Sequence, residues 1–104
     1  MQRVEQTILR HLIHTDEYSR KAFPFIQPEY FSDRCDKIVF ELISEFITKY
    51  NSLPAPEAIR ISLNERRDLA QSEYDDCVTL IREISDKPED IDSNWLVETT
   101  ESFC

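Results

Sequence analysis

The chain has 104 residues, of which 40% are hydrophobic and 32% charged, and its formal net charge is −9. This length gives one domain enough residues to bury a hydrophobic core, and the composition is that of a folded chain rather than a disordered one. The negative charge disfavours direct binding to a nucleic-acid backbone, and the absence of glycine excludes the glycine-rich phosphate-binding loops.

The first predicted helix covers residues 2–14, where apolar side chains recur at helical spacing: Val4, Ile8, Leu9, Leu12 and Ile13. Glu5 falls inside the same apolar arc. A carboxylate in that position is either a rim residue, whose stem packs while its head reaches water, or a buried acceptor paired with backbone or with an arginine.

A short second helix is predicted after Asp16, its expected N-cap, and Pro24 forces this helix to end or kink. Its apolar residues are Tyr18, Ala22 and Phe23. Pro28 then suits the first position of a single helical turn, which is expected to bury Tyr30 and Phe31.

The longest predicted helix spans residues 33–50, with Ser32 or Asp33 as its cap. Its apolar residues cover about half of the helix circumference, with Phe40 just beyond their edge: Cys35, Ile38, Val39, Leu42, Ile43, Phe46, Ile47 and Tyr50. A helix this apolar should be the central one, contacted on two sides. The remaining polar strip is expected to face water: Lys37, Glu41, Ser44, Glu45 and Thr48.

Three more helices are predicted in the second half of the chain. Pro56 opens the first of them, and a polar loop over residues 64–71 follows it. Its inner face carries Ala58, Ile59, Ser62 and Leu63. An approximate capping box, Ser72 with Asp75, begins the next helix, which residues 87–90 end. Its apolar residues are Tyr74, Cys77, Val78, Ile81 and Ile84. Ser93 is the expected cap of the last helix, which carries Trp95, Leu96, Thr99 and Phe103.

Together these patterns predict an all-α fold, a compact orthogonal bundle of about six helices in which residues 1–104 form a single domain. The core is expected to contain Ile8, Leu12, Phe31, Val39, Leu42, Ile43 and Phe46. The last helix reaches Cys104 without a C-terminal stop signal. We therefore expect this domain to be the front part of a longer protein, with a frayed natural terminus as the alternative.

No catalytic, cofactor-binding or metal-binding residues are predicted. His11 and His14 share a helix face and could hold a metal ion only with Asp16 or Glu17. A metal site needs three or four supported ligands, so two surface histidines are the simpler interpretation. Among the aromatic residues, Tyr18, Phe40 and Trp95 are the candidates for contact with a protein partner, because each lies at or beyond the edge of an apolar stripe. The alternative is that these three side chains complete the domain's own core.

The three cysteines, Cys35, Cys77 and Cys104, are widely separated and odd in number. This pattern favours free thiols in a reducing compartment over a disulfide framework. No apolar run is long enough to span a membrane, and the first residues lack the apolar segment of a secretory signal.

Several short segments follow one another in the order and spacing of a known family: Val-Glu-Gln-Thr-Ile-Leu at residues 4–9, Glu-Tyr-Phe at 29–31, Ile-Val-Phe at 38–40 and Pro-Ala-Pro at 54–56. Together they resemble the N-terminal domain of the DnaB-type replicative helicases. Among the subgroups, Tyr-Asn-Ser-Leu-Pro at residues 50–54, Ser-Glu-Tyr at 72–74 and the segment 88–97 most resemble the helicases of T-even-type bacteriophages. The resemblance covers about residues 4–103.

The resemblance implies a non-catalytic helical head that packs into the N-terminal collar of a hexameric ring, docks primase and acts in phage DNA replication. Its partners would be primase and other helicase subunits in the cytoplasm of an infected bacterium, with DNA bound only through the complete ring and no membrane involved. ATP and Mg are expected in a motor domain, whose phosphate-binding loop, acidic partner and arginine finger are absent from this sequence. No cofactor is expected in this chain.

Two alternatives remain open. One is a free-standing acidic helical adaptor or inhibitor that binds a basic protein, and the less favoured one is a small enzyme. A phosphate-binding loop encoded downstream would favour the helicase, and a stop codon would favour the adaptor. For the isolated chain we expect a monomer or weak dimer, because the family's ring forms mainly through a collar hairpin and a motor ring, and the negative charge repels copies at close range.

Overall fold

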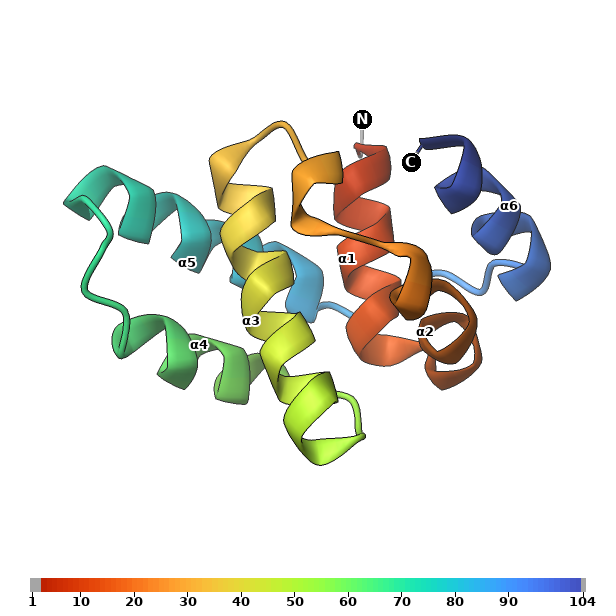
Figure 1. Cartoon of the computed structure of the whole chain (residues 1–104), viewed down its shortest axis with the longest axis horizontal. Helices are drawn as coiled ribbons and strands as arrows, with labels where there is room; N and C mark the ends of the chain where they lie inside the picture. Colours follow the sequence, from red (N-terminus) through yellow and green to blue (C-terminus); the bar gives the residue numbers. More distant parts are fainter. Residues whose placement is uncertain (1–2, 104) are drawn as a thin grey trace.

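Six α-helices and two 3₁₀ turns make up the computed structural model, which describes residues 3–103 (Figure 1). In chain order the elements are α1 (Val4–His14), α2 (Asp16–Ala22), η1 (Phe23–Phe25), η2 (Pro28–Tyr30), α3 (Arg34–Tyr50), α4 (Pro56–Asn64), α5 (Gln71–Ser85) and α6 (Ser93–Phe103). Within these residues no strand forms. The predicted all-α bundle of about six helices is therefore confirmed.

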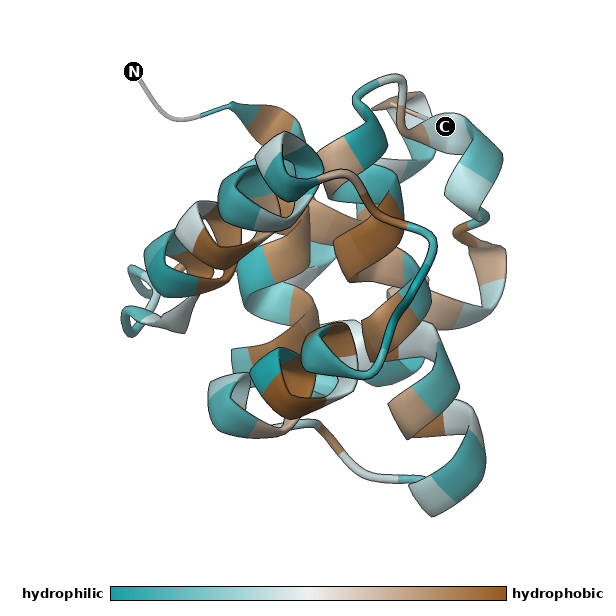
Figure 2. Cartoon of the chain, turned by 90° about the vertical axis from the view of Figure 1, so that its left-hand side faces the viewer, coloured by the Kyte–Doolittle hydropathy of each residue, from teal (hydrophilic) through white to brown (hydrophobic). Residues whose placement is uncertain are grey.

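Helix α3 is the centre of the bundle. It packs against α5 and α4 on one side and against α1 on the other, while α2 lies between α1 and α6 (Figure 1). Along each helix, hydrophobic segments alternate with hydrophilic ones, so every helix has a face to bury (Figure 2). The prediction that the longest helix is contacted on two sides is confirmed.

Six of the seven predicted core residues are buried: Ile8, Leu12, Phe31, Val39, Leu42 and Ile43. The prediction was wrong for Phe46, which is only partly buried. The Phe46 ring packs on Tyr50, which is exposed, with the centroids 4.7 Å apart. Tyr30, expected to be buried with Phe31, is exposed at the end of η2.

Two residues suited to their positions fix the ends of α3. At the start, Asp33 accepts a hydrogen bond from the backbone N–H of Cys35 at 2.9 Å, so Asp33 rather than Ser32 is the cap. At the end, Asn51 adopts a left-handed conformation with φ 52°, and its N–H donates to the Ile47 carbonyl at 2.8 Å. In a chain without glycine, asparagine is the residue that enters this conformation most readily.

Three other predicted cap residues do not cap their helices. The carboxylate of Asp92, not Ser93, accepts the first backbone N–H groups of α6. The Ser72–Asp75 pair is not used, because α5 already begins at Gln71 and Glu73 accepts the N–H of Ala70 at 2.9 Å. Asp16 is the first residue of α2 and does not cap it. In each case the helix was predicted and its first residue was missed by one or two positions.

Helix α1 is tied to the rest of the domain by side chains that reach across the bundle. Arg10 donates to the Glu83 carbonyl at 2.7 Å, and a ring nitrogen of His14 lies 2.9 Å from the Ile84 carbonyl. Glu5 is partly exposed, which agrees with the rim interpretation of this carboxylate. The buried acid near this helix is instead Asp36, which is paired with Arg3.

Candidate functional site

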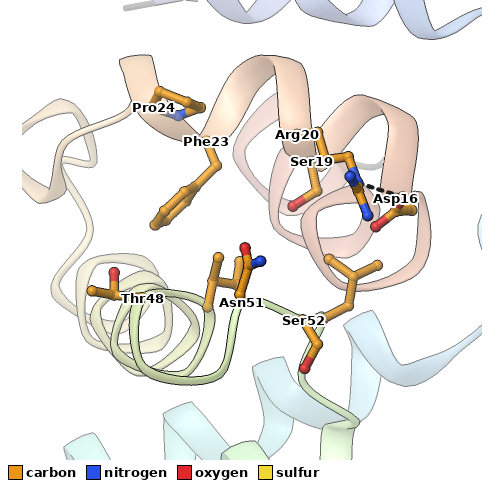
Figure 3. A pocket seen from close by; sticks show the side chains of 10 residues that line it. Asp16, Ser19, Arg20, Phe23, Pro24, Thr48, Asn51 and Ser52 are labelled. Carbon is orange, nitrogen blue, oxygen red and sulfur yellow. Dashed lines mark hydrogen bonds and ion pairs between the residues drawn. The ribbon is translucent and has the colours of Figure 1, made fainter.

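A groove opens between α2–η1 and the C-terminal end of α3 (Figure 3). Its volume is about 340 Å³. One wall comes from α2 and η1, through Asp16, Ser19, Arg20, Phe23 and Pro24. The opposite wall comes from the end of α3 and the loop after it, through Ile47, Thr48, Asn51, Ser52 and Leu53.

The local sequence explains why this groove stays open. Pro24 lies within η1 and prevents α2 from continuing, because proline has no N–H to donate and its ring clashes with the preceding helical turn. On the facing wall, the left-handed Asn51 ends α3 and turns the chain away. The Phe23 ring points from η1 toward α3, and the Asn51 side chain points back toward α2 (Figure 3). The space between these two walls remains accessible.

The chemistry of the groove suits binding rather than reaction. Its charged groups, Arg20 and Asp16, form an ion pair at 2.7 Å on exposed α2 side chains. The other lining side chains are hydroxyl, amide or apolar groups, which can hold an apolar side chain and hydrogen-bond its neighbours.

Two strongly exposed aromatic side chains adjoin the groove in sequence. Phe25 follows Pro24 and is 65% exposed, and Tyr50 precedes Asn51 and is 55% exposed. The Lys49 ammonium lies 5.3 Å from the centre of the Tyr50 ring. Large apolar side chains left in water next to a groove are characteristic of protein-binding surfaces. We call Phe25, Tyr50 and the lining residues of the groove the α2–α3 surface.

Of the three aromatic residues predicted to contact a partner, two were predicted wrongly. Tyr18 is buried, and its hydroxyl lies 2.7 Å from that of Thr100 on α6. Phe40 is buried against Phe31, with ring centroids 5.3 Å apart. Both side chains therefore complete the domain's own core, which is the alternative that the sequence left open.

Trp95, the third candidate, is 55% exposed on α6 and is therefore accessible to a partner. Its role in an interface stays a prediction. The sequence pattern missed Phe25 and Tyr50 for different reasons. Tyr50 was counted in the apolar face of the longest helix, and Phe25 lies between two prolines where no helical period applies. The sequence signal that could have identified Phe25 as exposed was its position between Pro24 and Pro28.

The two histidines of α1 do not converge on a metal site. The Nδ1 atom of His11 lies 2.8 Å from the Thr15 hydroxyl, and His14 faces the Ile84 carbonyl. Among residues 3–103 no group of three potential ligands comes together. The prediction of two surface histidines was wrong for His11, which is buried against Tyr18, and this burial lowers its pKa.

Among residues 3–103 no helix combines the length and apolar character needed to cross a bilayer.

No family model matches the chain. Over 98 residues, or 94% of the chain, its sequence is 36% identical to that of a DnaB-like replicative helicase from Enterobacteria phage T4. The aligned part is 20% of that helicase, so the chain spans about a fifth of its relative's length. This similarity confirms the predicted resemblance to the DnaB-type replicative helicases of T-even-type phages, and the all-helical domain is consistent with the N-terminal domain of such a helicase.

Proposed function

We propose that this chain is the non-catalytic N-terminal domain of a hexameric, ATP-dependent replicative DNA helicase that acts in phage DNA replication. Within that helicase it contributes to assembly of the ring and docks partners, primase among them. The observation that carries the proposal is the similarity along 94% of this chain to one fifth of a replicative helicase. ATP and Mg would bind in a motor domain elsewhere in the parent protein.

The α2–α3 surface is the place where we expect a partner to dock. It combines a groove with the two exposed aromatic side chains Phe25 and Tyr50. Because the chain carries a net charge of −9, the matching partner surface should present an apolar side chain among lysines and arginines. Trp95 on α6 remains a separate candidate contact.

The docking proposal can be tested by measuring, with titration calorimetry, the affinity of this chain for the primase of the same phage. Phe25→Ala and Tyr50→Ala should each weaken binding about fivefold or more, since exposed aromatics that become buried dominate interface energetics. Ile61→Ala is a matched control, because Ile61 on α4 is as exposed as Tyr50 but lies outside the groove. Unchanged affinity in both aromatic variants would exclude this surface as the primase site.

The proposed role of the domain in ring assembly is tested by analytical sedimentation. The isolated chain should sediment as a monomer or weak dimer at tens of micromolar, because its charge opposes self-association. A stable trimer or hexamer would show that this domain alone carries ring contacts.

The acidic charge also supports a second candidate, a free-standing adaptor that binds a basic protein. The gene distinguishes the two functions. A downstream sequence of the G-x-x-x-x-G-K-[ST] type identifies a helicase, and a stop codon directly after Cys104 identifies an adaptor.

A further inference from the structure

A second pocket lies between α4 and α5, away from the α2–α3 surface. The two helices pack against each other and are joined by the loop 65–70, so that the first turn of α4 lies near the last turn of α5 (Figure 1). From α4 the pocket is lined by Glu57 and Arg60. From α5 it is lined by Val78, Ile81 and Arg82. We call this cavity the α4–α5 pocket.

The α4–α5 pocket has an apolar floor and a charged rim. Val78 and Ile81 are three residues apart and therefore share a face of α5, where Ile81 is buried and Val78 partly buried. Arg60 and Arg82 are both exposed at the rim. The volume of about 260 Å³ lies below the range of about 300–1,000 Å³ that is typical of drug-sized ligands, so the pocket suits one or two side chains.

The two arginines of the rim have no acidic partner in the domain. Four other arginines each form an ion pair with a carboxylate. Within residues 3–103, by contrast, the guanidinium groups of Arg60 and Arg82 make no ion pair and no hydrogen bond, although the chain holds 21 acidic side chains against 12 basic ones. Glu57, which also lines the pocket, pairs with neither of them. The lining thus carries more positive than negative charge on a protein that is acidic as a whole.

These groups together select a class of ligand. A guanidinium binds a carboxylate through two parallel hydrogen bonds, and an apolar floor stabilises a large apolar side chain that leaves water. A nucleic-acid strand suits the pocket less well, because the net charge of −9 repels each of its phosphates. A short acidic peptide carries few charges, and salt screens its repulsion from parts of the surface further away than about 8 Å.

We propose that the α4–α5 pocket binds a short acidic peptide segment of a partner protein, in which one large apolar side chain stands between carboxylates. The apolar side chain packs on Val78 and Ile81, and the carboxylates on its two sides pair with Arg60 and Arg82. Because both arginines are unpaired in the free domain, binding breaks no existing ion pair. The site does not depend on the proposed helicase role, and its preference for an acidic ligand is opposite to that expected of the α2–α3 surface.

The test is a nuclear magnetic resonance titration of the isotope-labelled chain with the acetylated and amidated peptide Asp-Asp-Phe-Asp-Asp. Millimolar peptide should shift the amide signals of the pocket residues, and the shifts should saturate. Asp-Asp-Ala-Asp-Asp, which lacks the apolar side chain, and Lys-Lys-Phe-Lys-Lys, which reverses the charges, should each bind at least about fivefold more weakly. Shifts that do not saturate, equal affinity for the alanine peptide, or equal binding of inorganic phosphate at the same signals would overturn the proposal.

Matched variants separate the pocket from the general charge of the domain. Arg60→Gln and Arg82→Gln should each weaken binding of the phenylalanine peptide about threefold, since each removes one ion pair with the ligand. Arg67→Gln removes the same charge from an exposed arginine outside the pocket and should leave the affinity unchanged.

Glu57→Gln provides a variant that should gain affinity. It removes the carboxylate that repels an acidic ligand, and it should therefore bind the phenylalanine peptide more tightly than the parent chain does. Misfolding cannot produce such a gain, and a helical circular-dichroism spectrum verifies the fold of every variant. Equal weakening by Arg67→Gln and by the two pocket arginine variants, or weaker binding by Glu57→Gln, would contradict the assigned site.

Discussion

The guanidinium of Arg3 donates to both carboxylate oxygens of Asp36, at 2.8 and 3.0 Å, and so joins the start of α1 to the first turn of α3. The carboxylate is 1% exposed, whereas the arginine side chain is 44% exposed. A buried anion thus relies on a cation that reaches it from the surface. This asymmetry makes the arginine more important for stability than its own exposure suggests.

Removing the guanidinium should leave the Asp36 carboxylate buried without its counter-ion. We expect Arg3→Ala to lower the free energy of unfolding by roughly 2–3 kcal/mol, less than for a fully buried pair because solvent screens the arginine. Arg20→Ala, which removes the exposed pair with Asp16, is the matched control and should cost no more than about 0.5 kcal/mol. Urea unfolding followed by circular dichroism measures both, and similar costs for the two variants would contradict the prediction.

The cap of α6 gives a second prediction. Asp92→Ala should destabilise the domain by about 1 kcal/mol, because its carboxylate accepts the N–H groups of Asn94 and Trp95. Ser93→Ala is the control, since the Ser93 side chain has no capping hydrogen bond, and it should be close to neutral. If Ser93→Ala proved the more costly change in thermal unfolding, the cap would be the one expected from the sequence.

The end of α3 depends on a left-handed residue. Asn51→Gly should leave the free energy of unfolding within a few tenths of a kcal/mol, because glycine adopts positive φ without strain. Asn51→Ala should cost about 1 kcal/mol, because a Cβ atom without a polar group disfavours this conformation. Chemical denaturation of the two variants provides the comparison, and equal stability would show that α3 ends in another way.

His11 makes stability depend on pH. Burial lowers its pKa below the ordinary value of 6.5, and the charges of Arg10 and His14 lower it further. Above pH 6.5 the folded and unfolded states both hold the neutral ring, so the stabilisation is fully present. As the pH falls below this value the unfolded chain takes up the proton first, and the free energy of unfolding declines.

The measurement is the urea midpoint between about pH 7.5 and pH 5.5, above the range in which most carboxylates titrate. The slope should be reduced in His11→Asn, which has no titrating ring at this position. An unchanged slope in that variant would assign the pH dependence to other groups.

Helical periodicity predicted most of this fold because burial follows the apolar face of each helix. Ile8, Leu12 and Val39 lie on such faces and are buried as expected. Periodicity does not reveal which part of a wide apolar face the neighbouring helices cover: Ile47 packs against the core, whereas Phe46 packs on the exposed Tyr50. The predicted cap of α6 was wrong by one residue. Asp92 and Ser93 are both good capping residues, and only the backbone conformation selects one.

The docking surface was harder to predict than the core. An aromatic residue at the edge of a stripe is buried or exposed according to which other element covers that edge. Phe40 is covered by Phe23 of η1 and by Phe31, which follows η2, and Tyr18 is covered by α6. Nothing covers Phe25 and Tyr50 to the same degree. These differences arise from packing between segments distant in sequence, which a single helix pattern does not contain.

The contacts that hold α1 have a consequence for the order of events on the ribosome. Arg10 and His14 bind carbonyl groups 73 and 70 residues further along the chain. These two side chains therefore lack their acceptors until α5 has left the exit tunnel, a delay of roughly 4–15 s at ordinary elongation rates. During that time α1 can pack only against α2 and α3, and the face of α1 that meets α5 stays open to chaperones.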